Sequence, residues 1–222
     1  MATFAINTRV ELWKCRKTAA YWLAFVASAF IPLLMLLLYS TEGERFKKSF
    51  TVDPWPSVLK HAWQPMAALL LPIYVILATS LIVQLEYRNN TWKQVYASPR
   101  TYTDIFFSKF TVVHIFIIAT LLLFNMFLVL SGYIANMIHS EFAFFKTPVP
   151  WKDFFSITGK MYVSVLGMSA IQYWISLRLR NYIAPLGIGL GLMIVGVMVL
   201  EWKKSVYYPY AYSQVTFFID KS

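Results

Sequence analysis

Residues 86–109 carry the most distinctive chemistry of this chain, because charged and aromatic side chains gather there between two long apolar segments. Trp92 and Tyr96 are four positions apart, so in a helix they lie on one face. Pro99 disfavours helical geometry at the residue before it, which sets an end for such a helix. The sequence therefore predicts a short helix over residues 90–98 whose aromatic face docks onto a molecule outside the membrane, and we expect that molecule to be a protein.

Catalytic chemistry has weaker support in the sequence. An enzyme working inside a membrane needs a nucleophile with a base, or metal ligands, that converge at depth. The candidates His114, Asn125 and Gln172 lack a carboxylate partner in any apolar segment. The single cysteine, Cys15, lies among basic residues that lower a thiol pKa, but we interpret it as incidental. No glycine-rich phosphate loop and no cluster at metal-ligand spacing is present, so we predict no catalytic or metal site in this chain.

The composition is that of an integral membrane protein. Charged residues make up 14% of the 222 residues, against about a quarter in soluble domains. A membrane span needs about 20 apolar residues. Five segments meet this requirement, at residues 19–39, 62–85, 110–140, 161–177 and 181–200. We therefore predict an all-α, polytopic membrane protein that forms one transmembrane domain over residues 1–222. The first apolar segment has no cleavage pattern behind it, so we expect no cleavable signal peptide.

The formal net charge of +10 arises from basic residues that flank the spans, which favours contact with anionic lipids over nucleic acid. With the amino terminus inside, lysines and arginines divide ten inside against ten outside, so the positive-inside rule alone does not orient the chain. Four basic residues closely precede the first span, and seven of the ten acidic residues would lie outside. We therefore expect a cytoplasmic amino terminus.

Two segments beside the spans have helical patterns of their own. Within residues 4–18, Ile6, Val10 and Trp13 fall on one face of a helix, as in a helix that lies in the headgroup plane. The alternative is a polar extension of the first span. In the last span, Gly187 and Gly191 have the spacing of a close-packing helix face, and we expect them to pack within the subunit or across a subunit seam.

An aromatic segment follows the last span, and its candidate gate residues are Tyr207, Pro209, Tyr210 and Tyr212. Tyrosines at this position either anchor the protein at the interface or form an outer gate over an exit path. Pro209 would fix the bend of such a gate.

The pattern of residues 86–109 resembles the loop between spans two and three of type-two ABC exporter permeases. The matching residues are Glu86, Thr91-Trp92-Lys93, Tyr96-Ala97-Ser98-Pro99 and Lys109. Glu11-Leu12-Trp13-Lys14 before the first span and Tyr208-Pro209-Tyr210 after the last are similar as well. Within the family, the chain is most similar to the small permeases of antimicrobial-peptide exporters of the lantibiotic and bacitracin type, which confer immunity or resistance.

In that family the loop helix couples a separate ATPase to the membrane part. The resemblance implies that the ATPase-docking residues are Glu86, Thr91, Trp92, Lys93, Tyr96, Pro99 and Arg100. It implies that ATP and Mg²⁺ bind the ATPase, that this chain holds no cofactor, and that a second permease copy or a paralogue completes the membrane core. The location would be the bacterial cytoplasmic membrane. The family has six spans and this chain shows five, because residues 206–219 are too short and too polar for a sixth.

Two functions of different classes remain open at this point. One is a permease subunit that exports an amphipathic peptide, drug or lipid, driven by a separate ATPase. The other is a membrane immunity protein or intramembrane enzyme that acts without ATP. Because the apolar segments show no ion pair and no polar cluster, we expect substrate selection by shape and apolar contact.

Overall fold

The fold is built from α-helices, and the part of the chain that the structure describes contains no β-strand. This computed structural model describes residues 2–88, 101–181, 183–202 and 205–219. The helices are α1 (Ala2–Cys15), α2 (Ala19–Thr41), α3 (Gly43–Phe50), α4 (Trp55–Pro65), η1 (Met66–Leu70), α5 (Leu71–Arg88), α7 (Tyr102–Ile138), α8 (Trp151–Ser164), α9 (Leu166–Arg178), α10 (Ile183–Val199), η2 (Ser205–Tyr207), η3 (Pro209–Ala211) and α11 (Tyr212–Ile219). The all-helical membrane fold expected from the sequence is confirmed.

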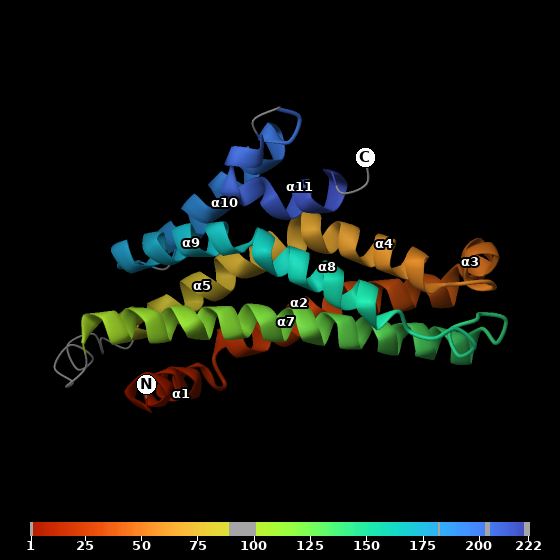
Figure 1. The fold of residues 1–222 in the computed structure, drawn as a ribbon, viewed down its shortest axis with the longest axis horizontal. Helices are drawn as coiled ribbons and strands as arrows, with labels where there is room; N and C mark the ends of the chain where they lie inside the picture. Colours follow the sequence, from red (N-terminus) through yellow and green to blue (C-terminus); the bar gives the residue numbers. More distant parts are fainter. Residues whose placement is uncertain (1, 89–100, 182, 203–204, 220–222) are drawn as a thin grey trace.

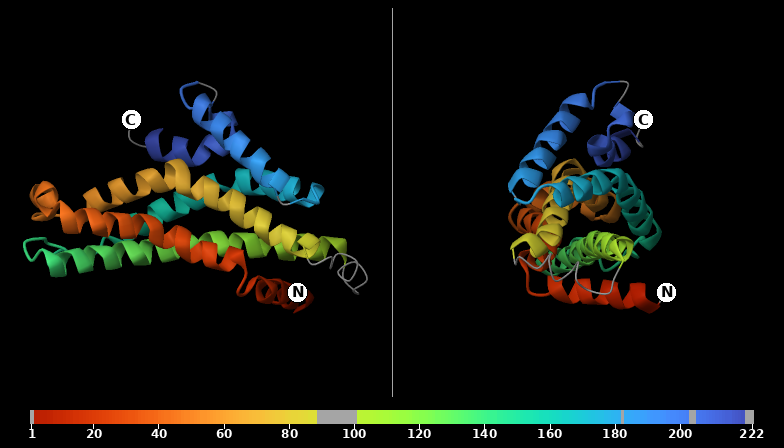
Figure 2. Two further views of the ribbon diagram at one scale, coloured as in Figure 1. Left: turned by 180° about the vertical axis from the view of Figure 1, so that it is seen from behind. Right: turned by 90° about the vertical axis from the view of Figure 1, so that its left-hand side faces the viewer.

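Helices α2, α5 and α7 form the long body of the molecule (Figures 1 and 2). The closest pair is α2 and α7, which pack along their length. The buried positions of α2 begin with Ala20, Ala24 and Ala27, and small side chains at helical spacing let two helices approach closely. At the start of α7 the Thr101 hydroxyl oxygen accepts a hydrogen bond from the Asp104 amide at 3.1 Å, which caps that end of the helix.

The two ends of this body differ. Helix α1 and the turn between α9 and α10 lie at the end where α5 finishes and α7 begins, which we call the α1 end (Figure 1). Helix α3 and the loop at 139–150 lie at the opposite end, which we call the α3 end. At the α3 end an aromatic cluster joins α2, α3 and the 139–150 loop, with Phe50 ring centroids 4.9 Å from Tyr39 and 5.2 Å from Phe142.

Within the described residues, three helical stretches are long and apolar enough to cross a membrane: Ala19–Thr41, Trp55–Tyr87 and Tyr102–Ile138. The pair α8 and α9 makes a fourth if it counts as one span bent by 41° at Val165. The fifth predicted segment forms α10, an apolar helix of 17 residues that is shorter than a standard span. The five apolar segments are therefore all helical, but two of them differ in shape from straight spans.

The chain after α10 folds back as α11, which packs against α8 and η1. Pro72 lacks the N–H that would bond to the carbonyl of Ala68 four residues earlier. The Gln214 side chain of α11 donates to that carbonyl instead, at 2.6 Å. A proline in one span thus creates a backbone acceptor that holds the carboxyl-terminal helix in place.

Helix α1 has the orientation expected of an interfacial helix. Ile6, Val10 and Trp13 are exposed, whereas Asn7 and Glu11 are buried against the rest of the protein. The apolar face therefore points outward and the polar face points inward, which suits a helix whose surroundings are lipid.

Candidate functional site

A buried cluster of four charged side chains joins three helices at the α1 end. Lys109 of α7 lies between two carboxylates, with its Nζ 2.5 Å from Glu11 Oε2 and 3.4 Å from Glu86 Oε1. Lys14 of α1 contacts the same two acids, at 2.7 Å from Glu11 Oε1 and 2.8 Å from Glu86 Oε1. Two carboxylates and two ammonium groups give the cluster no net charge.

The cluster is shielded from water. The side chains of Lys109, Glu86 and Glu11 are only 2%, 3% and 4% exposed, and Lys14, at 35%, forms its open side. Burial lowers the pKa of Lys14, but hydrogen bonds to Glu11 and Glu86 and their negative charges outweigh burial, so the pKa lies above its usual value. A buried charge is retained only when it is paired, so all four groups depend on one another.

The ion cluster, defined as Glu11, Lys14, Glu86 and Lys109, flanks segment 89–100 in the sequence. Glu86 lies three residues before that segment and Lys109 lies nine residues after it. Glu11 and Lys14 add the interfacial helix α1 to the same point. Any displacement of the segment that moves the end of α5 or the start of α7 therefore acts directly on α1.

Helix α9 is tied to the same end of α5. The Gln84 side-chain amide donates to the carbonyls of Ser176 at 3.1 Å and Leu179 at 2.7 Å, and the Tyr87 hydroxyl donates to the carbonyl of Leu177 at 2.9 Å. These acceptors lie in the last turn of α9 or, for Leu179, at its C-cap, where carbonyls have no partner within the helix.

A cavity of about 230 Å³ lies between α5, α7 and α9, and its walls include Lys109 of the ion cluster. The remaining lining residues are aromatic or aliphatic: Tyr87, Tyr102, Ile105, Phe106, Tyr173 and Leu177. The α1 end of the molecule thus combines the ion cluster with an adjoining cavity.

The sequence model of the family described as ABC-2 family transporter protein matches residues 8–196. The chain belongs to the ABC-2 transporter family. Comparison with curated proteins and with solved structures finds no match. The matched range contains the whole ion cluster, so the cluster is part of the membrane permease domain of an ABC transporter.

Most of the ATPase-docking residues predicted for this permease lie outside the described residues: Thr91, Trp92, Lys93, Tyr96, Pro99 and Arg100, together with the helix expected over residues 90–98. Their docking role stays a prediction. Glu86 is described, and it is buried in the ion cluster. Because Glu86 contacts Lys14 and Lys109 within the protein, any contribution of Glu86 to docking would be indirect.

The glycine face of α10 differs from the expected one. A Cβ atom at Gly187 or Gly191 would meet nothing within 4 Å in the described part of the permease, so neither glycine packs within the subunit there. A Cβ atom at Gly189 would lie 2.5 Å from Gln172 Oε1, and one at Gly196 would lie 3.2 Å from the Tyr210 backbone. The close-packing face is therefore that of Gly189 and Gly196. Packing of Gly187 and Gly191 across a subunit seam remains a prediction.

The predicted gate segment divides into exposed and buried parts. Tyr207 is exposed, Tyr212 is half-buried, and Pro209 begins η3. Tyr210 is buried, and its hydroxyl donates to Gln172 Oε1 at 3.0 Å. The gating role stays a prediction, and Tyr210 has a packing contact of its own in this structure.

Tyr210 and Gln172 belong to a polar cluster that sequence reasoning missed. The Gln172 side-chain nitrogen donates to Ser80 Oγ at 3.0 Å and to the Pro185 carbonyl at 2.9 Å. The expectation that the spans hold no polar cluster is therefore wrong. Its members are far apart in sequence and meet only because α5, α9, α10 and η3 pack together. They bond to one another and to helix carbonyls, so the cluster joins helices.

The residues weighed for catalysis do not converge in the described structure. His114 Nδ1 lies 3.3 Å from the Tyr162 hydroxyl, and the Asn125 side-chain nitrogen donates to Thr158 Oγ1 at 2.6 Å. Gln172 belongs to the polar cluster above. Cys15 is buried, and burial raises the pKa of its thiol to about 11. These contacts connect helices and give no arrangement of nucleophile and base.

Proposed function

We propose that this permease is the membrane subunit of an ATP-driven exporter whose ATPase is a separate polypeptide that docks on segment 89–100. The observation that carries the proposal is the ion cluster, because it links both flanks of that segment to α1 in a chain of the ABC-2 transporter family. ATP and Mg²⁺ would bind the partner ATPase. A second permease copy or a paralogue would complete the membrane core.

The cluster supplies a physical route from docking to the membrane part. Breaking a buried pair by removing one partner costs about 3–5 kcal/mol, so the cluster moves as a unit unless a comparable energy is supplied. A push on the docking segment would move the end of α5 and the start of α7 together, and α1 would follow through Glu11 and Lys14. The base of the coupling loop would thus behave as one rigid body.

The transported molecule would be amphipathic, such as an antimicrobial peptide, a drug or a lipid. The support is that the outward surfaces of α2 and α7 are apolar along most of their length, so the permease presents its long helices to lipid, where such molecules partition. The resemblance to antimicrobial-peptide exporters of the lantibiotic and bacitracin type favours a peptide. The site would be the bacterial cytoplasmic membrane, with the α1 end inside the cell.

Copurification tests the docking part of this proposal. We expect the tagged permease to retain its ATPase, and we expect Trp92→Ala with Tyr96→Ala to release it, because each aromatic anchor of an interface contributes about 2 kcal/mol or more. The matched control is Trp202→Ala with Tyr207→Ala, which removes an exposed tryptophan and tyrosine beyond α10. Equal ATPase recovery from both double variants would overturn the docking assignment. A permease that copurifies with no ATPase would favour ATP-independent immunity.

A further inference from the structure

The outer surface of α2 is apolar and that of α4 is polar, although both helices belong to the same bundle. The exposed side chains of α2 from Trp22 to Leu38 are all apolar. The exposed side chains of α4 include no large apolar residue and consist of Pro56, Lys60, His61, Gln64 and Pro65. A polar surface such as that of α4 is unsuited to contact with lipid tails.

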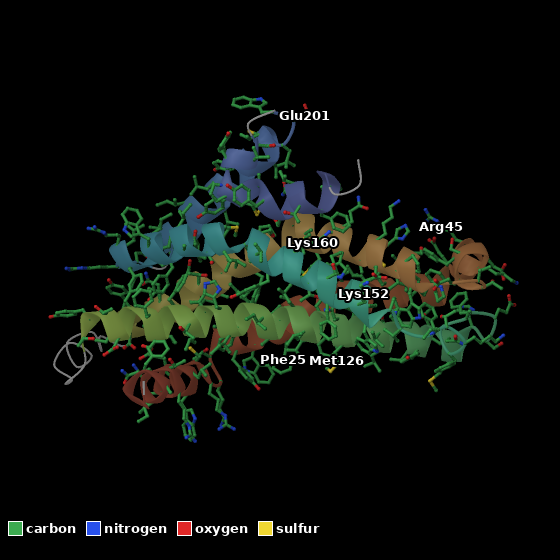
Figure 3. All side chains as sticks on the ribbon, viewed as in Figure 1. Phe25, Arg45, Met126, Lys152, Lys160 and Glu201 are labelled. Atoms are coloured by element: carbon green, nitrogen blue, oxygen red, sulfur yellow. The ribbon has the colours of Figure 1, made fainter. Side chains whose placement is uncertain are left out.

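Helix α8 extends this polar surface. Lys152, Asp153, Ser156 and Lys160 are exposed on it at spacings of three and four residues, which places them on one side of the helix. The two helices are neighbours, since the rings of Trp55 and Phe154 lie 6.0 Å apart. A cavity of about 190 Å³ is lined by Leu59 of α4 together with α8 residues that include Asp153, Ser156 and Lys160. Figure 3 shows Lys152 and Lys160 on α8, on a different side of the bundle from Phe25 and Met126.

Contacts with α7 place this polar surface at membrane depth. The Trp63 ring of α4 lies 5.0 Å from Phe124 of α7, and Gln64 follows Trp63 directly. On the other side of α7, an apolar groove with α2 extends to Leu130 and Ile134. Those residues lie six and ten positions beyond Phe124, or about 9–15 Å closer to the α3 end. The apolar surface of α2 and α7 therefore continues closer to the α3 end than Gln64, so α4 is polar at a depth where the α2 side is still apolar.

We propose that α4 and α8 line a water-filled vestibule that opens at the α3 end and receives the anionic group of an amphipathic molecule. Charged groups at membrane depth face water-filled cavities or other protein, and the cavity lined by Leu59 of α4 with Asp153, Ser156 and Lys160 of α8 favours water. Lys60 and Lys152 supply positive charge, and neither lies within ion-pair distance of an acid in the described residues. The other side of α8 is apolar, and it forms a groove of about 170 Å³ with α7 that includes Met126, Trp151 and Phe155. The choice of an amphipathic ligand rests on the proposed export function, but the presence of water does not.

Thiol labelling in intact cells tests for the water. In a Cys15→Ser background, Ser156→Cys and Gln64→Cys are each treated from outside with a membrane-impermeant maleimide. The matched control is Met126→Cys, at similar depth on the lipid-facing side, and Val52→Cys in the exposed loop before α4 reports whether the α3 end is outside. We expect both vestibule cysteines to react at a rate within about tenfold of Val52→Cys and Met126→Cys to remain unlabelled.

A pair of charged reagents tests the anion preference at Ser156→Cys. We compare anionic 2-sulfonatoethyl and cationic 2-trimethylammonioethyl methanethiosulfonate. Lys152 lies one helical turn from Ser156, about 6 Å away. At that distance one unit charge in water at physiological salt changes the anion-to-cation rate ratio about threefold. We therefore expect Lys152→Gln to lower this ratio about threefold, and Lys146→Gln, in the loop before α8, to leave it unchanged.

The outcomes separate this inference from the export proposal, because labelling needs neither ATP nor an ATPase. Protection of both vestibule cysteines while Val52→Cys reacts would overturn the water-filled vestibule and would indicate that lipid or a second protein covers this face. Equal labelling of Met126→Cys would overturn the assigned difference between the two sides. A rate ratio that Lys152→Gln does not change would overturn the anion site. Two vestibule positions are used so that a fault in the assembly of one variant leaves the other to decide.

Discussion

Replacing Lys109 by methionine would test whether the ion cluster holds α1 against the spans. The substitution removes an ammonium group at 2.5 Å from Glu11 and 3.4 Å from Glu86, while Lys14 stays in contact with both carboxylates. Loss of one partner from a buried ion pair costs about 3–5 kcal/mol. Because whole domains are stable by only about 5–15 kcal/mol, we expect a large fall in resistance to unfolding.

Adding a second substitution, Glu11→Gln, tests whether the loss of stability comes from the broken contact between Lys109 and Glu11. In the double variant Lys109→Met with Glu11→Gln, the remaining pair of Lys14 and Glu86 at 2.8 Å is neutral. We therefore expect the double variant to lose about 0.5–3 kcal/mol less than the sum of the two single variants, which is the range of coupling energies found between residues in one charged network. The assay is unfolding by SDS in mixed micelles, followed by tryptophan fluorescence.

The exposed ion pair of Lys47 and Glu141, at 2.6 Å, serves as the control, and its double-variant cycle should show little coupling because water screens both charges. Strict additivity at Lys109 and Glu11 would contradict a coupled ion cluster, because it would mean that the two side chains do not depend on each other in the folded permease.

Three further predictions follow from packing and burial. Gly189→Ala should destabilise the permease by about 1–3 kcal/mol, because its new Cβ would meet Gln172. A Cβ at Gly191 meets nothing within 4 Å in the described residues, so Gly191→Ala should not destabilise the subunit; thermal unfolding in detergent distinguishes the two variants. Tyr210→Phe should cost about 1–3 kcal/mol by leaving the amide oxygen of Gln172 without its donor, as measured by the same assay. Cys15 should react with maleimide at pH 8 more than about a hundredfold more slowly in the native permease than after denaturation, because its pKa of about 11 leaves little thiolate and burial limits access; equal rates would contradict its buried position.

The long helices could be predicted because their signal is local. A run such as residues 19–39 contains enough apolar residues to cross a bilayer whatever its neighbours are. The outward face of α1 was predictable for the same reason, since Ile6, Val10 and Trp13 fall on one face by spacing alone. The bend at Val165 was not predicted, because no proline or glycine occupies the residue where α8 gives way to α9.

The ion cluster could not be found in the sequence, because its members come from three helices and their contacts depend on how those helices are rotated. In the sequence Glu11 and Lys109 are simply charges that flank spans, separated by 98 positions. The face on which α10 packs within the subunit could not be identified for a related reason. That helix is apolar on every side, so spacing did not distinguish the face of Gly189 from that of Gly191, and only the position of Gln172 does so.

Transport by reconstituted permease and ATPase in vesicles would test the central claim most directly. ATP or a non-hydrolysable analogue would be added to the solution outside inside-out vesicles. Uptake of a fluorescent amphipathic peptide into the vesicles would then be followed. We expect uptake that needs ATP hydrolysis and the permease, and that is lost in the Trp92→Ala, Tyr96→Ala variant. Uptake that continues without ATP, or that survives this substitution unchanged, would contradict the claim.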